Sequence, residues 1–383
     1  MTEGELWTAK QRQMFPIHYT ISYRASFKPE LPEFFIRKYL LERGVEKGRV
    51  LDPFGGRGTT ALQANLMGFA ALHSDLNPVS HFLASSRQTI LPVTDLLKKL
   101  ESLDLKKKKF VLSSEEKERF LPFFHQETLQ EILNLRAALH SKKGASDPAI
   151  RYIGLTALSR LHGHSDGFFS VYSFPQISIM PGAQRKNNLS RGLVPEYRDV
   201  KKRIAKKIIK DLSRDLPNHY HRVSRQNEYI IADARNIHPA PSRSVDLVIT
   251  SPPFLNKVDY LTDNWMRSWF LNMEGHRPDL MVTPSLTEWK SFMSDVIREM
   301  GRLLRPEGRA VIEVGEVVIG AHTQNLEEIL VDLLPMDVEG GRLYAEEVYI
   351  NSQSFTKLAN CWDVKNNERG TNTNRCLVIV KGT

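Results

Sequence analysis

Residues 48–76 constrain the fold of this chain more than any other segment. The apolar run 48–54 leads into a glycine-rich turn, 59–68 has the apolar spacing of a helix, and 69–76 is a second apolar run. A strand, a tight turn, a helix and another strand in this order are typical of a parallel sheet with helices on its faces. The segment therefore predicts the start of a doubly wound α/β sheet.

The same rhythm returns in the C-terminal part of the chain after a long interruption. The apolar runs predict strands at 227–237, 244–254 and 309–319, a helix at 286–304, and a closing antiparallel pair at 345–355 and 374–382. The interruption is longer than an ordinary connection, and its apolar spacing is mostly helical. We therefore expect one sheet domain built from residues 1–90 and 227–383, with a helical insertion at 91–226. Within the insertion, 163–188 has no sustained period and predicts a loop.

The positive charge of the chain is concentrated in this insertion. The whole chain carries a net charge of +9, and residues 101–230 alone hold 24 Lys and Arg against 14 Asp and Glu. A basic region of this kind suits a surface that binds a polyanion, but lysine-rich helices also serve simply to keep a surface hydrated. From charge alone, nucleic-acid binding and a solvated helical face are both open interpretations.

The composition predicts a soluble cytoplasmic protein. Apolar residues make up 41% of the chain, and no apolar run approaches the roughly 18 residues needed to span a bilayer. The first residues lack the apolar core of a signal peptide. The two cysteines, Cys361 and Cys376, are too few for a disulfide framework or a zinc site. We expect neither a membrane partner nor a bound metal.

The glycine-rich turn is the first candidate ligand site. It begins at Asp52 and runs through Gly56 and Gly58 to Thr60. Glycine lets the backbone turn sharply and approach a ligand closely, and open α/β sheets bind ligands at the carboxyl ends of their strands. The turn lacks the Gly-Lys-Ser/Thr of nucleotide-triphosphate loops and the G-x-G-x-x-G of dinucleotide sites. Asp75, which ends the next strand, suits the ribose diol of a nucleoside-containing cofactor; a ligand-free turn and a helix-capping aspartate are the alternatives.

A second candidate site, Ser251-Pro252-Pro253-Phe254, also follows a predicted strand. Two consecutive prolines cannot donate to a sheet, so the strand must end there. They also stiffen the backbone, which holds the Ser251 hydroxyl and nearby carbonyls as hydrogen-bond acceptors beside an aromatic ring. Such a site suits a planar base with an exocyclic amine, whereas a strand-ending turn with a buried phenylalanine is the simpler interpretation.

Taken together, the two motifs resemble those of the DNA amino-methyltransferases. In that family a D-P-F-x-G-x-G-T-T turn binds S-adenosylmethionine and a (D/N/S)-P-P-(Y/F) tetrapeptide holds the target amine. The resemblance covers about residues 14–90 and 227–383. It implies a Rossmann-like class I methyltransferase sheet, mostly parallel with an antiparallel C-terminal hairpin. It assigns cofactor binding to Phe27, Lys28, Pro29, Asp52, Phe54, Gly55, Gly56, Gly58, Thr59, Thr60, Asp75, Leu76, Asn77, Asp233 and Ala234.

The resemblance also implies a reaction. The serine form of the tetrapeptide is similar to that of enzymes acting on N4 of cytosine, with Ser251, Pro252, Pro253 and Phe254 as catalytic residues. No cysteine lies near either motif, so the amine would attack the methyl group directly. Ser251 Oγ and the Pro252 carbonyl would accept the amine hydrogens while Phe254 stacks on the flipped base. Adenine N6 is an alternative target, followed by an RNA methyltransferase and a non-catalytic binding protein.

Double-stranded DNA is the partner that the resemblance implies, with a cognate restriction endonuclease as a further candidate. We expect Lys202, Lys206 and Lys210 to form a helical stripe that follows phosphates, and Arg185 and Lys186 to reach base edges. Solvated surface residues are the alternative for both groups.

Overall fold

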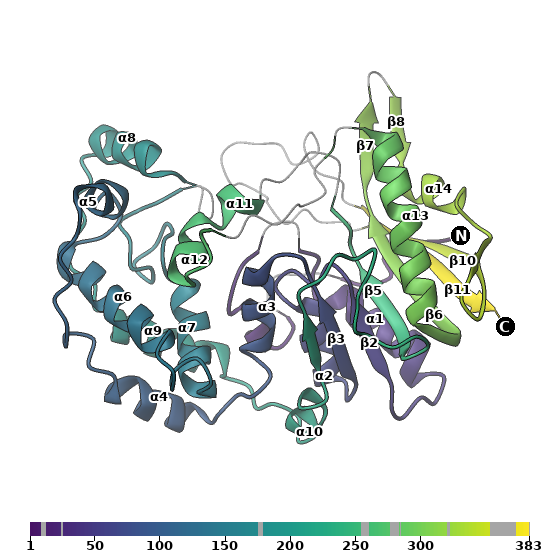
Figure 1. Cartoon of the computed structure of the whole chain (residues 1–383), viewed down its shortest axis with the longest axis horizontal. Helices are drawn as coiled ribbons and strands as arrows, with labels where there is room; N and C mark the ends of the chain where they lie inside the picture. The colour runs from purple at the N-terminus through teal and green to yellow at the C-terminus, as the bar shows by residue number, and fades with distance from the viewer. Residues whose placement is uncertain are drawn as a thin grey trace.

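The computed structural model describes most of the chain (Figure 1). The described residues are 1–8, 13–23, 26–174, 179–253, 260–275, 283, 285–319, 322–352 and 373–382. The first part of the sheet domain contains β1 (Thr2–Gly4), η1 (Pro16–Tyr19), α1 (Glu30–Ile36), η2 (Arg37–Leu41), β2 (Arg49–Asp52), α2 (Thr59–Leu66), β3 (Ala70–Ser74) and α3 (Pro78–Ser85). Within the described residues, none of the helices is both long and apolar enough to cross a bilayer.

The helical insertion and the second part of the sheet domain follow. The insertion contains α4 (Val93–Ser102), α5 (Ser114–Phe120), α6 (Gln126–Leu139), α7 (Pro148–Leu158), α8 (Pro181–Arg191), α9 (Val200–Asp211) and α10 (Tyr220–Ser224). The second part contains β4 (Glu228–Ile230), β5 (Val245–Thr250), α11 (Tyr260–Asp263), α12 (Trp265–Phe270), α13 (Leu286–Leu303), β6 (Leu304–Val314), β7 (Glu316–Ile319), β8 (His322–Asn325), α14 (Leu326–Val331), β9 (Met336–Val338), β10 (Gly341–Ser352) and β11 (Thr373–Gly382).

The strand order of the main sheet is β1-β10-β11-β6-β5-β2-β3-β4, with β9 paired to β10. The strands from β6 to β4 are parallel to their neighbours, whereas β11 runs antiparallel to both β6 and β10. This order confirms the predicted Rossmann-like sheet, which is mostly parallel with an antiparallel C-terminal pair. The parallel pairing of β1 with β10 at the edge was not predicted from the sequence pattern.

Helices cover both faces of the sheet because its strands are apolar on both faces. Leu51 of β2 and Val248 of β5 pack in one apolar cluster with α13 and α14. Their chain neighbours Val50 and Ile249 pack in another cluster with α1 and α2. Successive side chains of a strand point to opposite faces, so a strand buried on both faces is apolar throughout. The result is a three-layer domain, with α13 on one side of the sheet in Figure 1.

The insertion forms a helical body beside the sheet domain (left in Figure 1). Its apolar cluster includes Leu96, Ile132, Ile153 and Ile204, from α4, α6, α7 and α9. The same cluster contains Leu83 of α3, so the body packs directly on the sheet domain.

The helical body also receives α12, from outside the predicted insertion. Trp265 and Trp269 are buried in the same apolar cluster, and Phe120 of α5 lies 4.2 Å from the ring of Trp269. A segment that follows the tetrapeptide therefore completes the core of the insertion.

Three predicted elements differ from the structure. The strand predicted at 309–319 is divided, because β6 ends at Val314 and β7 pairs with β8 in a separate sheet. The loop predicted for 163–188 is wrong from Pro181 onward, because α8 begins there. Its polar sequence hid the helix, since α8 buries only Gln184 and so has no apolar stripe. The strand predicted at 227–237 is short: β4 ends at Ile230, and a turn follows in which Asn236 N donates to Asp233 O.

Candidate active site

The two candidate motifs follow β2 and β5, which lie side by side in the middle of the sheet. After β2 the chain enters α2 on one face of the sheet, and after β5 it leads to α13 on the other face. This is the point at which the winding direction of the sheet changes. Open α/β sheets form their ligand crevice at such a point, outside the carboxyl ends of the strands. The glycine turn and Ser251 therefore share the edge where a ligand is expected.

The glycine turn is shaped by contacts within the protein. Gly56 and Gly58 have φ angles of +50° and +76°, in the left-handed region that favours glycine. A Cβ on Gly58 would lie 2.7 Å from Ala84 Cβ, so this glycine permits the close packing of α3. A Cβ on Gly55 would lie 2.2 Å from the ring of His73, whereas one on Gly56 would come no closer than 3.6 Å, to the Tyr23 ring.

Asp52 joins the two motifs. Its Oδ2 accepts a hydrogen bond from Thr60 Oγ1 at 2.8 Å, and its Oδ1 accepts from Thr250 Oγ1 at 2.7 Å and from Phe54 N at 3.2 Å. Asp52 is buried, and this burial raises its pKa to about 6. The resemblance assigns Asp52 and Thr60 to the cofactor, but here both side chains tie the glycine turn to the residue that precedes Ser251.

Asp75 holds the glycine turn from the next strand. Its Oδ2 accepts from Gly56 N at 2.7 Å, and its Oδ1 accepts from Asn77 N at 2.8 Å. Burial raises the pKa of this carboxyl, although the residue as a whole is only half-buried. Asn77, not Asp75, caps α3, because Asn77 Oδ1 accepts from Val79 N at 3.0 Å. Each carboxylate oxygen of Asp75 can still accept a second hydrogen bond from a ligand.

Several other residues assigned to the cofactor are placed around this turn. Thr59 Oγ1 accepts from Arg57 Nε at 3.0 Å. Phe27 packs against the apolar cluster of α1, and Lys28 O accepts from Leu31 N at the start of that helix. Pro29 is buried, whereas Lys28, Phe54 and Leu76 are half-buried.

Asp233 lies beyond the end of β4 and is paired with Arg235. The guanidinium contacts both carboxylate oxygens, with Arg235 Nη2 2.6 Å from Oδ2, and this pairing lowers the pKa of Asp233. The guanidinium also lies 5.4 Å from the centre of the Phe292 ring, which is 6.0 Å from that of Phe54. Ala234 is buried. A chain of contacts through Arg235, Phe292 and Phe54 thus connects Asp233 to the glycine turn.

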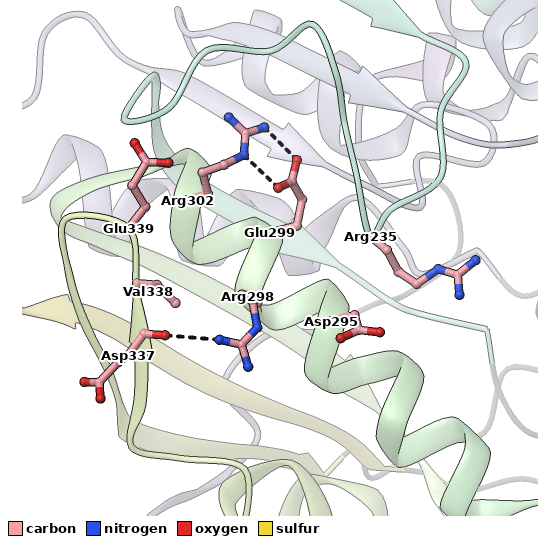
Figure 2. A pocket seen from close by; sticks show the side chains of 8 residues that line it. All are labelled: Arg235, Asp295, Arg298, Glu299, Arg302, Asp337, Val338 and Glu339. Carbon is pink, nitrogen blue, oxygen red and sulfur yellow. Dashed lines mark hydrogen bonds and ion pairs between the residues drawn. The ribbon is translucent and has the colours of Figure 1, made fainter.

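Arg235 also lies at one end of a cavity of about 630 Å³ (Figure 2). The other lining residues come from the second half of α13 and from 337–339, and include the Arg302–Glu299 ion pair at 2.7 Å. In Figure 2 the side chain of Arg235 extends away from this pair. Neither Asp75 nor Ser251 lines this cavity, and Arg235, which pairs with Asp233, is the lining residue that connects it to the candidate active site.

The tetrapeptide begins where β5 ends at Thr250. Ser251 Oγ is buried and has no hydrogen-bond partner among the described residues. Pro252 is buried, and the Pro253 carbonyl accepts from Trp289 Nε1 of α13 at 3.0 Å. Phe254 lies outside the described residues. A buried hydroxyl without a partner is costly, so an unpaired one at the expected ligand edge is a candidate contact for a substrate.

A segment that sequence reasoning missed, Pro16–Tyr23, lies beside the glycine turn. Its carbonyls accept hydrogen bonds from three buried cationic side chains: Arg57 Nη1 donates to His18 O and Ile21 O, both at 3.2 Å, Lys207 Nζ to Tyr19 O at 3.0 Å, and Arg267 Nη2 to Ser22 O at 2.7 Å. These cations belong to the glycine turn, to α9 and to α12. Tyr23 OH accepts from Asn77 Nδ2 at 3.3 Å. The segment thus links the helical insertion to the glycine turn. No local sequence pattern predicts this link, because the residues that form it are far apart in the chain.

The residues expected to contact nucleic acid are exposed. Lys202, Lys206 and Lys210 are exposed on α9 at intervals of four residues, and Arg185 and Lys186 are exposed on α8. Lys207, in contrast, is buried and paired with Asp211.

Comparison with known proteins finds a methyltransferase of similar sequence. No protein-family profile matches the chain. Over 276 residues, 64% of this chain and 50% of the other, it is 27% identical to the type II methyltransferase M.BsoBI of Geobacillus stearothermophilus. The chain therefore spans about half the length of this relative.

Similar solved structures are distant. TrmN from Thermus thermophilus is 13% identical, with a TM-score of 0.37 over 96% of this chain and 52% of that one. The rRNA methyltransferase aviRa from Streptomyces viridochromogenes is 12% identical, with a TM-score of 0.34 over 97% and 94%. A TehB-like SAM-dependent methyltransferase from Corynebacterium glutamicum is 9% identical, with a TM-score of 0.32 over 94% and 89%. The Rossmann-like sheet and the sequence similarity to M.BsoBI together support a SAM-dependent methyltransferase.

Proposed function

We propose that this protein transfers a methyl group from S-adenosylmethionine to an exocyclic amine of a DNA base, with N4 of cytosine as the favoured target. The observation that carries the proposal is the buried hydroxyl of Ser251, which has no hydrogen-bond partner in the described part of the chain and follows the residue tied to the glycine turn by Asp52. The similarity to a type II methyltransferase supports DNA as the substrate, and the serine of the tetrapeptide favours cytosine.

The residues around the turn fit S-adenosylmethionine. No side chain among the described residues caps the first turn of α2, so its N–H groups suit the carboxylate of the methionine part. Asp75 has acceptor capacity left for the ribose diol. Asp233 suits the adenine amine, provided that Arg235 shares or releases its carboxylate. When bound, this cofactor supplies an electrophilic methyl group.

The protein's own contribution is to position the amine and to accept hydrogen bonds from it. The lone pair of an exocyclic amine is delocalised into the ring, so the nitrogen is a weak nucleophile. Hydrogen bonds from the amine to Ser251 Oγ and to the Pro252 carbonyl would favour tetrahedral geometry at nitrogen. Because Trp289 holds the Pro253 carbonyl and Asp52 holds Thr250, both acceptors sit on a fixed backbone.

The test is transfer of labelled methyl groups from S-adenosylmethionine to duplex DNA, followed by nucleoside analysis. We expect N4-methylcytosine. N6-methyladenine would redirect the base assignment, and methylation of RNA alone would redirect the substrate. Product in the form of 5-methylcytosine would contradict direct attack by an amine. Sequencing with base-modification detection, on genomic DNA from a methylation-free host that expresses the protein, would identify the methylated sequence.

A further inference from the structure

The helix α8 differs from the other helices of the insertion in how it is held. Gln184 is its one buried side chain, so apolar burial, which usually stabilises a surface helix, is almost absent. Side-chain amides hold it instead. Gln184 Nε2 donates to Tyr172 O at 2.9 Å and to Asn188 Oδ1 at 2.7 Å, and Asn188 Nδ2 donates to Pro122 O at 2.7 Å. Nearly the whole circumference of α8 is therefore presented to solvent.

The exposed face of α8 combines positive charge with an apolar side chain. Lys186 and Leu189 lie on the side opposite Gln184, since residues three to four apart share one face of a helix. Arg185 flanks them, and Arg191 is exposed at the end of the helix. Leu189 is 85% exposed. No acidic residue occurs between Asp166 and Glu196, so nothing in this stretch offsets the charge.

The position of α8 relates it to the candidate active site. The indole of Trp265 in α12, which follows the tetrapeptide in sequence, donates to Ile179 O at 3.1 Å, just before α8 begins. In Figure 1, α8 lies at the upper left, with α11 and α12 between it and the sheet. The helix α8 lies on the same side of the molecule as the junction between β6 and β7. This is also the side of the carboxyl ends of the parallel strands.

We infer that α8 is the element that enters a groove of duplex DNA, with Arg185 and Lys186 on the phosphates that flank the groove and Leu189 against a base. This inference rests on the proposed function. Its occupant follows from charge: a helix with three basic side chains and no acidic one complements phosphates. An α-helix fits the major groove, where apolar side chains contact the thymine methyl group. The role of α8 then differs from that of the α9 stripe, which would contact phosphates without regard to sequence.

The experiment separates the charges from the apolar contact. Arg185→Gln with Lys186→Gln should lower the salt slope of duplex binding, measured by fluorescence anisotropy, by about two, because each phosphate contact contributes roughly 0.9. Leu189→Ala should leave the salt slope unchanged but reduce the preference for the methylated sequence, found by modification sequencing of the wild type, over a scrambled duplex at least tenfold. Lys142→Gln with Lys143→Gln removes two exposed charges elsewhere on the insertion and should change neither quantity.

Two results would overturn the inference. One is an unchanged salt slope in the α8 charge variant, and the other is wild-type sequence preference in Leu189→Ala. All of these side chains are exposed, so far-UV circular dichroism should show wild-type folding. The salt-slope measurement needs neither turnover nor knowledge of the methylated sequence. If wild-type protein binds duplex DNA through α8 but transfers no methyl group, the proposed function fails while the inference about α8 stands.

Discussion

At the residue scale, Ser251 is the residue that bears most directly on the proposed reaction. We expect Ser251→Ala to lower the single-turnover rate of methyl transfer roughly 10- to 100-fold, about 1.4–2.7 kcal/mol. The affinity for S-adenosylmethionine should stay near that of the wild type, because the lost contact is to the amine and strengthens as the nitrogen leaves planarity. Rapid-quench transfer and calorimetric titration measure the two quantities.

Ser244→Ala is the matched control for this prediction. Ser244 precedes β5 at its other end, where its Oγ donates to Pro241 O, so the change removes a hydroxyl without touching the candidate site. Transfer at the wild-type rate by Ser251→Ala would contradict the assigned role.

Asp75 offers a second test, directed at the cofactor. Asp75→Asn should weaken binding of S-adenosylmethionine about tenfold or more, because a hydrogen bond to a charged acceptor contributes about 1.5–3 kcal/mol. It should also destabilise the glycine turn. The two carboxylate oxygens of Asp75 accept hydrogen bonds from Gly56 N and Asn77 N, whereas the asparagine amide offers only one acceptor oxygen. Calorimetry and thermal unfolding report the two effects separately.

Asp246→Asn provides the control for Asp75. Asp246 Oδ2 accepts from Arg49 N at 2.7 Å at the opposite edge of the same strands. This variant should lose stability without losing cofactor affinity. Equal loss of affinity in both variants would mean that Asp75 acts only through the fold.

The sequence predicted the location of the candidate site better than the partners of its residues. Local pattern sufficed to place the glycine turn and Ser251 after strands, and parallel strands then bring them to one edge. The pairing of Asp52 with Thr250 joins residues 198 positions apart, so no local pattern encodes it. The residues of the Asp233–Arg235 pair are only two positions apart. Their side chains can pair because the chain turns after β4, whereas the sequence predicted that the strand would continue there.

At the scale of elements, α9 shows one helix with two roles. Ile204 and Ile208 are buried in the insertion core, whereas Lys202, Lys206 and Lys210 face solvent. Helical spacing was sufficient to predict this division. It was insufficient for α8, because that helix is held by Gln184 and Asn188 amides rather than by an apolar stripe.

Replacing Lys202, Lys206 and Lys210 together by glutamine should weaken duplex binding equally across sequences. The salt slope should fall by up to about 2.7, if each lysine contacts one phosphate. Titrations at several salt concentrations, with the methylated sequence and with a scrambled duplex, test this.

Lys207→Gln, in the same helix, is the contrasting variant. Lys207 is buried against Asp211 and donates to Tyr19 O, so its loss should reduce stability and leave the salt slope unchanged. An unchanged slope in the triple variant would mean that the α9 stripe does not face DNA.

At the scale of the whole molecule, buried histidines connect stability to pH. Burial lowers the pKa of His18, His73 and His162 to about 3. The three lie in the Pro16–Tyr23 segment, in β3 and in the insertion, so both parts of the molecule are affected. In the native state they stay neutral, whereas the unfolded chain binds a proton at each below pH 6.5. Their contribution to stability is therefore complete above pH 6.5 and is lost as the pH falls toward 3. Asp52, whose pKa is raised, opposes this trend between about pH 4 and 6.

The contribution of one histidine can be isolated at His162. Its Nδ1 is buried without a partner among the described residues, and its ring centre lies 5.9 Å from that of Phe123, so burial disfavours a proton at this site. Below pH 6 each such histidine steepens the loss of stability by up to about 1.4 kcal/mol per pH unit.

His162→Gln should remove that increment between pH 4 and 6, whatever constant change in stability it also causes. Urea unfolding at half-unit pH intervals measures the slope, with the exposed His164→Gln as control. A wild-type slope in His162→Gln would show that the native protein protonates this histidine, and that the insertion opens enough at low pH to admit water to its core.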